Sequence, residues 1–266
     1  MKSNLTSDYY PLRWHIILFM AAVHLVALIS LPFVSVPNLV ALGILYPLTA
    51  IGVTIGLHRM MSHHSFEAPK WLERFLVTCG ALAAQGGPIE WIGLHRHHHI
   101  NSDLPQDHHD SRRGFWWAHM RWMFHTVPAM DKIENLTKDL QKDPYYVWLE
   151  QNFLLLQLPL AALLYLVGGW SMVGWGIFVR LVVVYHITWL VNSATHTWGY
   201  QSFDSEDNSR NNWWVALLTF GEGWHNNHHA RQVRARHGMR WWELDVTYWI
   251  IFTLEKLRLV RRVHHY

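Results

Sequence analysis

The sequence predicts an all-α integral membrane protein: four transmembrane helices in two hairpins, with a helical cap on the cytoplasmic side. Two observations predict this fold class. The chain contains long stretches without charged residues, and its histidines gather in the charged segments between and after them. Of the 266 residues, 51% are hydrophobic and only 15% are charged, which is low for a soluble protein. The formal net charge of +3 is too small to indicate nucleic acid as a partner.

The first apolar stretch predicts one helical hairpin. Residues 14–57 contain no Asp, Glu, Lys or Arg. This length is about twice the ~20 residues that cross the hydrocarbon core of a bilayer. Prolines and small polar residues mark a break near residues 35–38. We therefore expect spans at roughly 15–34 and 38–57, with His58 at the exit of the second span.

The second apolar stretch predicts another hairpin. Residues 151–203 contain Arg180 and no other Asp, Glu, Lys or Arg. Glycines between residues 168 and 174 interrupt the stretch, so we expect spans at roughly 152–168 and 174–194. A cation within a span either reaches the membrane surface or finds an internal partner. We expect Arg180 to reach the outer interface by snorkelling.

The distribution of Lys and Arg predicts the orientation. With one exception, these residues lie in the polar arm 1–13, in the loop 58–150 or in the tail 204–266. An even number of spans places both termini and the long loop on one side, and the excess of Lys and Arg marks that side as cytoplasmic. We expect a single multi-pass domain, 1–266, whose cytoplasmic cap consists of 58–150 and 195–266.

Histidine is unusually frequent, with 21 residues, and many of them form three clusters. In the second and third clusters, histidines recur at positions i, i+3 and i+4, which share one face of a helix. Neutral imidazoles at this spacing can bind a common metal ion. The clusters are His58, His63 and His64; His95, His97, His98 and His99; and His225, His228 and His229.

The spacing within the first cluster differs from that of the other two. His58 and His63 are five residues apart and would diverge by roughly 140° on a continuous α-helix. We therefore expect the helix to end between them. With the two spaced triplets, this makes eight candidate imidazoles, too many for one ion but suitable for two ions in a shared site. A nitrogen-rich ligand set favours iron, zinc, copper or nickel.

Longer segments around these clusters carry a specific resemblance. They are His58–His63, Gln85–Trp91 leading into His95–His99, Asn192–His196 and Gly221–His229. The chain resembles the integral-membrane fatty acid desaturases of the stearoyl (Δ9) type, especially the cyanobacterial and bacterial acyl-lipid branch. The resemblance implies a bacterial inner membrane or a thylakoid as the location.

The resemblance also implies a centre of two iron ions (Fe2+) with nine histidine ligands. Asn192 matches an asparagine that reaches the metal through water. The spacing alone does not indicate His196 or Asn192. The resemblance implies no ligand at His64 or His97. The roles of His108 and His109 are left open. The implied ligands are His58, His63, His95, His98, His99, His196, His225, His228 and His229.

The implied reaction is an O2-dependent dehydrogenation that places a cis double bond in a saturated acyl chain. O2 is the co-substrate and leaves as water. Gln85, Trp91 and Thr188 match positions that shape the bend of the acyl tunnel near the irons. Carboxylates should orient the imidazoles from behind, and Asp107 and Glu222 are candidates because they lie near the clusters in sequence.

The sequence gives weaker evidence on the acyl carrier and the electron donor than on the metal centre. In the animal acyl-CoA branch, an Arg-Asp pair precedes the second cluster, and an Arg-Lys pair lies further along. Here those positions hold Gly93-Leu94 and His125-Thr126. A multiply charged CoA thus loses charge-assisted hydrogen bonds of about 1.5–3 kcal/mol each, which favours a membrane lipid over an acyl thioester. We expect an external donor, either ferredoxin or a cytochrome b5-like protein.

Two other functions use similar features. A di-iron membrane fatty acid hydroxylase has similar clusters, but the complete matches at Asn192–His196 and Gly221–His229 favour a desaturase. A metal transporter or haem-binding membrane protein is the non-enzymatic alternative. A transporter should place its ligands near the middle of the membrane, whereas the three clusters here lie outside the predicted spans.

Overall fold

The computed structural model describes residues 10–266, so most of the polar arm 1–13 lies outside the described residues. Within the described residues the fold is helical, with isolated β-bridges and no strand. The α-helices are α1 (Trp14–Ser30), α2 (Val36–Ile51), α3 (Lys70–Ala81), α4 (Pro88–Asn101), α5 (Phe115–His119), α6 (Ile133–Leu136), α7 (Pro144–Asn152), α8 (Gln157–Val173), α9 (Arg180–Ser193), α10 (Trp213–Leu218), α11 (His225–Ala230) and α12 (Val246–Lys256).

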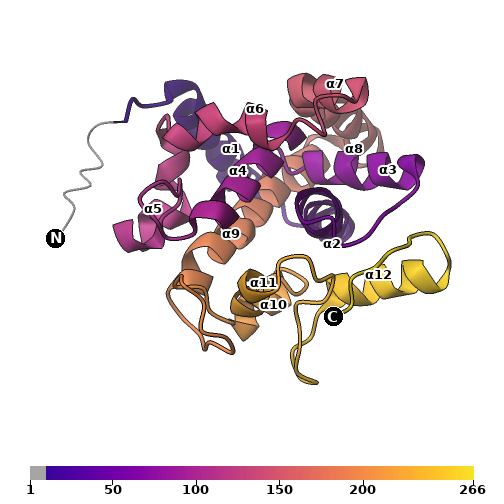
Figure 1. Ribbon diagram of the computed structural model, residues 1–266. Coiled ribbons are helices and arrows are strands. Elements are labelled where there is room, and N and C mark those ends of the chain that lie inside the picture. The colour runs from indigo at the N-terminus through magenta and orange to yellow at the C-terminus, as the bar shows by residue number, and fades with distance from the viewer. Residues whose placement is uncertain (1–9) are drawn as a thin grey trace.

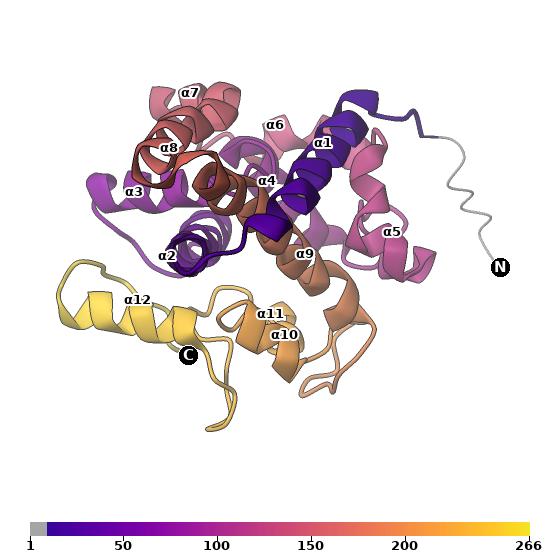
Figure 2. The ribbon, with the colours of Figure 1, turned by 180° about the vertical axis from the view of Figure 1, so that it is seen from behind.

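Shorter segments connect or extend these helices. Two are π-helical, η3 (Gly52–Ser62) and η8 (Gly174–Val179). The 3-10 segments are η2 (Leu31–Phe33), η4 (Ser111–Arg113), η5 (Arg121–Phe124), η6 (Pro128–Lys132), η7 (Phe153–Leu156) and η9 (Ala194–His196). Figures 1 and 2 show α2 and α9 in the middle of the molecule, with α4 to α7 on one side and α10 to α12 on the other.

Among residues 10–266, three continuous helical stretches are long and apolar enough to cross a membrane. They are Trp14–Phe33, Val36–Ser62 and Pro144–His196. The first two correspond to the predicted hairpin around residues 35–38. The helix of the second stretch continues through η3 to Ser62, beyond the approximate end of the predicted span at residue 57.

The third stretch contains the predicted break. Gly168 and Gly169 have non-helical backbone angles, and the φ of +66° at Gly169 is one that glycine adopts without a steric penalty. Helical backbone resumes at Trp170. The interruption is therefore shorter than the predicted 168–174, because two glycines suffice to break the helix.

The prediction that Arg180 snorkels to the surface was wrong. Its side chain is fully buried. Its guanidinium donates to Thr49 Oγ1 of α2 at 2.7 Å and to Gln157 Oε1 of α8 at 2.8 Å. Polar partners on neighbouring helices at the same depth satisfy the cation internally. The sequence contains both partners but does not show that they face Arg180.

Small residues let α3 lie directly across η3. A Cβ on Gly52 would overlap the backbone of Cys79 and Gly80, and one on Gly56 would lie 2.7 Å from Leu76 O. Close helix contacts of this kind depend on residues without side chains. The contact is part of an apolar core that includes Ile55, and this core holds η3 beneath α4 and α7.

Candidate metal centre

The nine histidines that the resemblance implies lie together in two groups. Within each group, one potential ligand nitrogen from every residue lies within 4.8 Å of all the others. We call them the first and second histidine groups. The first group is His58, His63, His95, His99 and His228, and the second is His98, His196, His225 and His229.

A π-helical turn brings the first cluster together. His63 N donates to His58 O at 3.2 Å, which is the i→i+5 hydrogen bond of a π-helix. The two imidazole rings lie 4.8 Å apart between centroids. The helix does end between these residues, at Ser62, as expected. The convergence arises from the wider π-helical turn that carries His58, which the α-helical estimate did not foresee.

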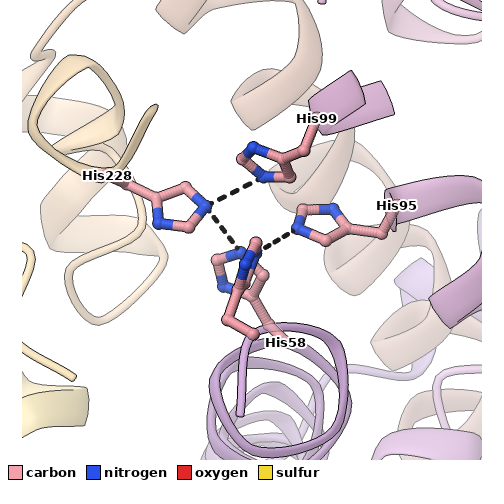
Figure 3. Close-up of side chains that lie close together, drawn as sticks. His58, His95, His99 and His228 are labelled. Atoms are coloured by element: carbon pink, nitrogen blue, oxygen red, sulfur yellow. Dashed lines mark hydrogen bonds between the residues drawn. The ribbon is translucent and has the colours of Figure 1, made fainter. Parts of the chain in front are cut away.

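The two spaced triplets lie on α4 and α11, and each helix contributes to both groups. His95 and His99 of α4 point toward His58 and His228, as Figure 3 shows. His98, on the same helix, belongs to the second group with His196 of η9. The i, i+3, i+4 spacing thus presents adjacent imidazoles to two neighbouring centres.

The distances within the groups match those of metal ligands. His63 Nε2 lies 2.8 Å from His95 Nε2, and His228 Nε2 lies 3.0 Å from His99 Nε2 and 3.1 Å from His58 Nε2. Nitrogens bound about 2.0–2.1 Å from one ion at right angles would be about 3 Å apart. A neutral imidazole has a single N–H, so several converging rings cannot all donate to one another.

Carboxylates determine which nitrogens face the second group. Asp107 accepts from His98 Nδ1 at 2.9 Å, and Asp103 accepts from His196 Nδ1 at 2.8 Å. Asp207 accepts from His229 Nδ1. With the proton at Nδ1, each Nε2 presents a lone pair to the group.

Two such lone pairs then face each other. His98 Nε2 and His229 Nε2 are 3.4 Å apart, and both rings have Nδ1 protonated by the bonds just described. Lone pairs at this distance repel unless a cation lies between them. The donor set therefore fits a metal ion. Asp107 was predicted, whereas Asp103 and Asp207 were missed, although Asp103 stands four residues after His99 and could have been considered.

The first group has one carboxylate beside it. Glu222 Oε2 lies 2.6 Å from His58 Nδ1, as the sequence proximity indicated. The other oxygen accepts from the buried guanidinium of Arg59 at 2.8 and 3.1 Å. Burial alone would raise the pKa of Glu222, but Arg59 and the neighbouring imidazoles hold the pKa well below its ordinary value. Glu222 is therefore ionised at neutral pH.

Burial lowers the pKa of several of these imidazoles, whereas for the buried His196 the bond to Asp103 outweighs burial and raises the pKa. Burial lowers the pKa of His95, His99, His225 and His228 well below the ordinary value, and neighbouring imidazoles lower it further. Burial also lowers the pKa of His229 to about 4 despite its bond to Asp207. Neutral imidazoles with available lone pairs are the form that binds metal.

The other histidines of the clusters differ in their surroundings. The side chain of His64 is 67% exposed, close to Arg96 and Asp139. His97 is buried next to Asn101. The ring of His109, which the sequence left open, is tilted against that of His98, with the two centroids 4.1 Å apart. His237 had no sequence signal beyond its own presence, yet its ring lies 4.3 Å from that of His228.

A cavity of about 410 Å3 adjoins the first group. His95, Asn192, Gln85, Trp91 and Thr188 all line it, together with apolar side chains. The Trp91 indole N–H donates to Gln85 Oε1 at 3.3 Å, and its ring stacks on His95. The residues predicted for the tunnel bend therefore lie where an apolar cavity meets the histidines.

Comparison with known proteins agrees with this arrangement. A family profile described as "Fatty acid desaturase" matches residues 35–264. The chain is 53% identical to an sn-1 stearoyl-lipid 9-desaturase of Synechocystis sp., over 99% of this chain and 85% of that protein. It is 49% identical to an sn-1 stearoyl-lipid 9-desaturase of Anabaena variabilis, over 97% and 96%. It is 47% identical to an sn-2 palmitoyl-lipid 9-desaturase of Nostoc sp., over 95% and 90%.

Proposed function

The chain belongs to the fatty acid desaturase family, and from this premise we propose that it desaturates the acyl chains of membrane lipids at Δ9. The reaction places a cis double bond in a saturated chain and reduces O2 to water. The single observation that supports this most directly is the cavity whose wall is shared by apolar side chains and His95. An acyl chain there would lie against the imidazoles of the first group.

We propose that the two histidine groups bind two iron ions through the nine imidazoles, with Asn192 acting through a water molecule. When bound, the irons supply the oxidising power that removes hydrogen from an unactivated methylene with O2 as oxidant. Asp103, Asp107 and Asp207 hold the proton at Nδ1 of their imidazoles. The Nε2 atoms thereby stay available as ligands.

The cavity has two tasks in this reaction. Its apolar walls exclude water from the reacting methylenes. Methylenes are chemically alike, so only their position in a shaped cavity can select the bond that is oxidised. We propose that Gln85, Trp91 and Thr188 set this position at the bend beside His95.

The three relatives described above and the local packing favour an acyl lipid, although acyl-CoA desaturases of Anemone leveillei and Limnanthes douglasii are also related, at 41% and 43% identity. The Synechocystis and Anabaena proteins are described as acting on stearoyl lipids. A Cβ on Gly93 would lie 2.8 Å from Ile133 Cγ2, so the arginine of the acyl-CoA branch has no room here. His125 is also occupied, because its Nδ1 contacts Tyr10 O at 3.0 Å.

We propose four spans with both termini and the cap, 58–150 and 195–266, in the cytoplasm. The cap and spans then form one domain in a bacterial inner membrane or a thylakoid. The non-helical Gly168 and Gly169 support a turn within the third apolar stretch. Cysteine labelling from each side tests this: a cysteine placed near residue 130 should react only from the cytoplasmic side.

The electron balance of the reaction shows that an external electron donor is needed. Desaturation removes two electrons from the substrate, while reduction of O2 to water takes four. Two electrons and two protons must therefore come from outside the substrate. We propose an external ferredoxin or cytochrome b5-like protein as their source.

Expression in a host without its own desaturase tests the proposed function. Fatty acid profiles should gain a cis-9 unsaturated product, initially within intact lipids. A hydroxylated product would show that the chain is a hydroxylase. Absence of any new product, with iron bound and an electron donor present, would refute the proposal.

A further inference from the structure

The cavity at the histidines is also bounded by residues at the start of the first apolar helix. Arg13, the last charged residue before that helix, lines the cavity with Ile16 of α1. Glu90 of α4 and Leu154 of η7 line it as well. Residues of α1, α4 and η7 thus contribute to the wall of one cavity.

Arg13 and Glu90 form a polar rim there. Arg13 Nη2 lies 3.6 Å from Glu90 Oε1, and the two side chains are 19% and 29% exposed. Both side chains therefore keep accessible surface beside the cavity that they line. The backbone of Arg13 is held in place, because its N–H donates to Phe124 O at 2.8 Å. Gly86 makes room for the carboxylate, since a Cβ there would lie 2.9 Å from Glu90 Oε2.

The wall of the cavity also contains an exposed apolar residue of η7. Leu154 is 44% exposed although it lines the cavity, and the adjacent Leu155 is 52% exposed. Leu18, on the outside of α1, is 66% exposed. Leu18, Leu154 and Leu155 lie within the proposed spans, where exposed apolar side chains face lipid. The cavity therefore has a mouth that is polar at Arg13 and Glu90 and lipid-facing at Leu154.

This inference rests on the proposed acyl-lipid desaturation. We propose that Arg13 and Glu90 bind the glycerol-ester end of an uncharged, hydroxyl-bearing membrane lipid, whose acyl chain enters sideways between α1 and η7. Arg13 donates hydrogen bonds to ester oxygens, and Glu90 accepts them from headgroup hydroxyls. A partly exposed ion pair is weak, so a ligand that satisfies both partners can separate it.

The carboxylate gives the mouth its selectivity. A phosphate-bearing headgroup would gain a contact with Arg13 but would meet the like charge of Glu90. Several phosphates, as in CoA, would increase that repulsion. An uncharged headgroup with hydroxyls can use both the donor and the acceptor. The pair therefore favours glycolipids over phospholipids and over acyl thioesters.

Binding to the iron-loaded protein tests the proposal independently of turnover. Brominated stearoyl chains in a monoglycosyl lipid should quench tryptophan fluorescence, since Trp91 and Trp122 line the cavity. Arg13→Gln and Glu90→Gln should each weaken binding about tenfold, the effect of losing one charge-assisted hydrogen bond. Glu134→Gln, at an exposed carboxylate of α6, is the matched control and should bind as the wild type does.

Kinetics with a competent electron donor separate the possible lipids. Vesicles carry the same stearoyl chain in a monoglycosyl lipid or in phosphatidylglycerol, and stearoyl-CoA is offered in detergent. The wild type should prefer the glycolipid, and Glu90→Gln should reduce that preference about tenfold by improving use of phosphatidylglycerol. Ile16→Trp and Leu154→Trp should raise KM for both lipids by narrowing the mouth, with iron content as the check of folding.

Two results would overturn the proposal. One is wild-type binding and KM in Arg13→Gln and Glu90→Gln. The other is a wild-type preference for phosphatidylglycerol or stearoyl-CoA. Failure of the proposed function has a different signature, in which the iron-loaded wild type binds the brominated glycolipid tightly but desaturates none of the three substrates.

Discussion

Within the described residues, one carboxylate, Glu222, lies beside the first histidine group, whereas three aspartates each hold one imidazole of the second group. The first group takes its ligands from η3, α4 and α11 and from His63, which follows η3 directly. In the second group, His196 stands at the end of a helix, and two of the aspartates come from the loops that face it. Carboxylates thus hold three of the four imidazoles of the second group, including His98 of α4 and His229 of α11, although the same two helices also supply ligands to the first group.

Removal of one imidazole should have the largest effect, and it tests whether both groups are needed. His98→Ala takes away the only α4 ligand of the second group. We expect no detectable unsaturated product and a loss of bound iron, while the protein still inserts into the membrane. Fatty acid profiles and iron per polypeptide measure this. Full activity in this variant would show that the second group has no metal function.

Glu222 contacts both His58 and Arg59, so its substitution should also lower the stability of the fold. Glu222→Gln takes one carboxylate partner away from the fully buried Arg59, and the contact with Asp245 remains. Breaking a buried ion pair on one side costs about 3–5 kcal/mol. We expect a large fall in the thermal unfolding temperature of the detergent-solubilised protein. An unchanged unfolding temperature would show that Glu222 acts only on His58.

A carboxylate of the second group should affect function more than stability. Asp207→Asn keeps the size of the side chain but removes the charge that holds the proton at His229 Nδ1. We expect a fall of about 10–100-fold in activity or iron affinity. The unfolding temperature should change much less than in Glu222→Gln. Equal losses of stability in the two variants would remove the distinction between the groups.

The helix contact beneath the first group predicts a smaller effect. Gly56→Ala places a Cβ 2.7 Å from Leu76 O, against backbone that cannot move aside easily. Overpacking of this kind costs about 1–3 kcal/mol. Gly43→Ala on the same continuous helix is the matched control, because nothing lies within 4 Å of the added Cβ. Thermal unfolding should separate the two variants, and equal unfolding temperatures would contradict the close contact.

The smallest effect is expected at the exposed histidine of the first cluster. His64 adjoins a proposed ligand in sequence, but its side chain lies outside both groups. His64→Ala should retain activity within about twofold, as surface substitutions usually do. Iron content should equal that of the wild type. Loss of iron would show that His64 is a ligand of the first group.

Several features of the site were predictable because they depend on neighbours in sequence. The recurrence of histidine at i, i+3 and i+4 indicated that His95, His98 and His99 share a helix, which α4 confirms. The division of these three between two groups was not predictable. Rings on one helix point in slightly different directions, and distant segments determine what each ring meets.

The hydrogen-bond partners of Arg180 and His196 were missed for the same reason, because they come from distant parts of the sequence. Arg180 contacts Thr49 and Gln157, which lie 131 and 23 residues away. Asp103 meets His196 across 93 residues. Hydrogen-bond partners at such separations depend on how helices pack, and one sequence without its fold contains no measure of that packing.

The sequence by itself determined the membrane class, the break at the glycines near residue 168 and the identity of the histidine clusters. These follow from hydrophobicity, charge and helical spacing, which are local properties of the chain. Only the tertiary structure decided the π-helical pairing of His58 with His63, the aspartates behind the second group and the mouth at Arg13 and Glu90. Each of these depends on backbone hydrogen bonding or on side chains brought together from distant segments, and no local pattern specifies such contacts.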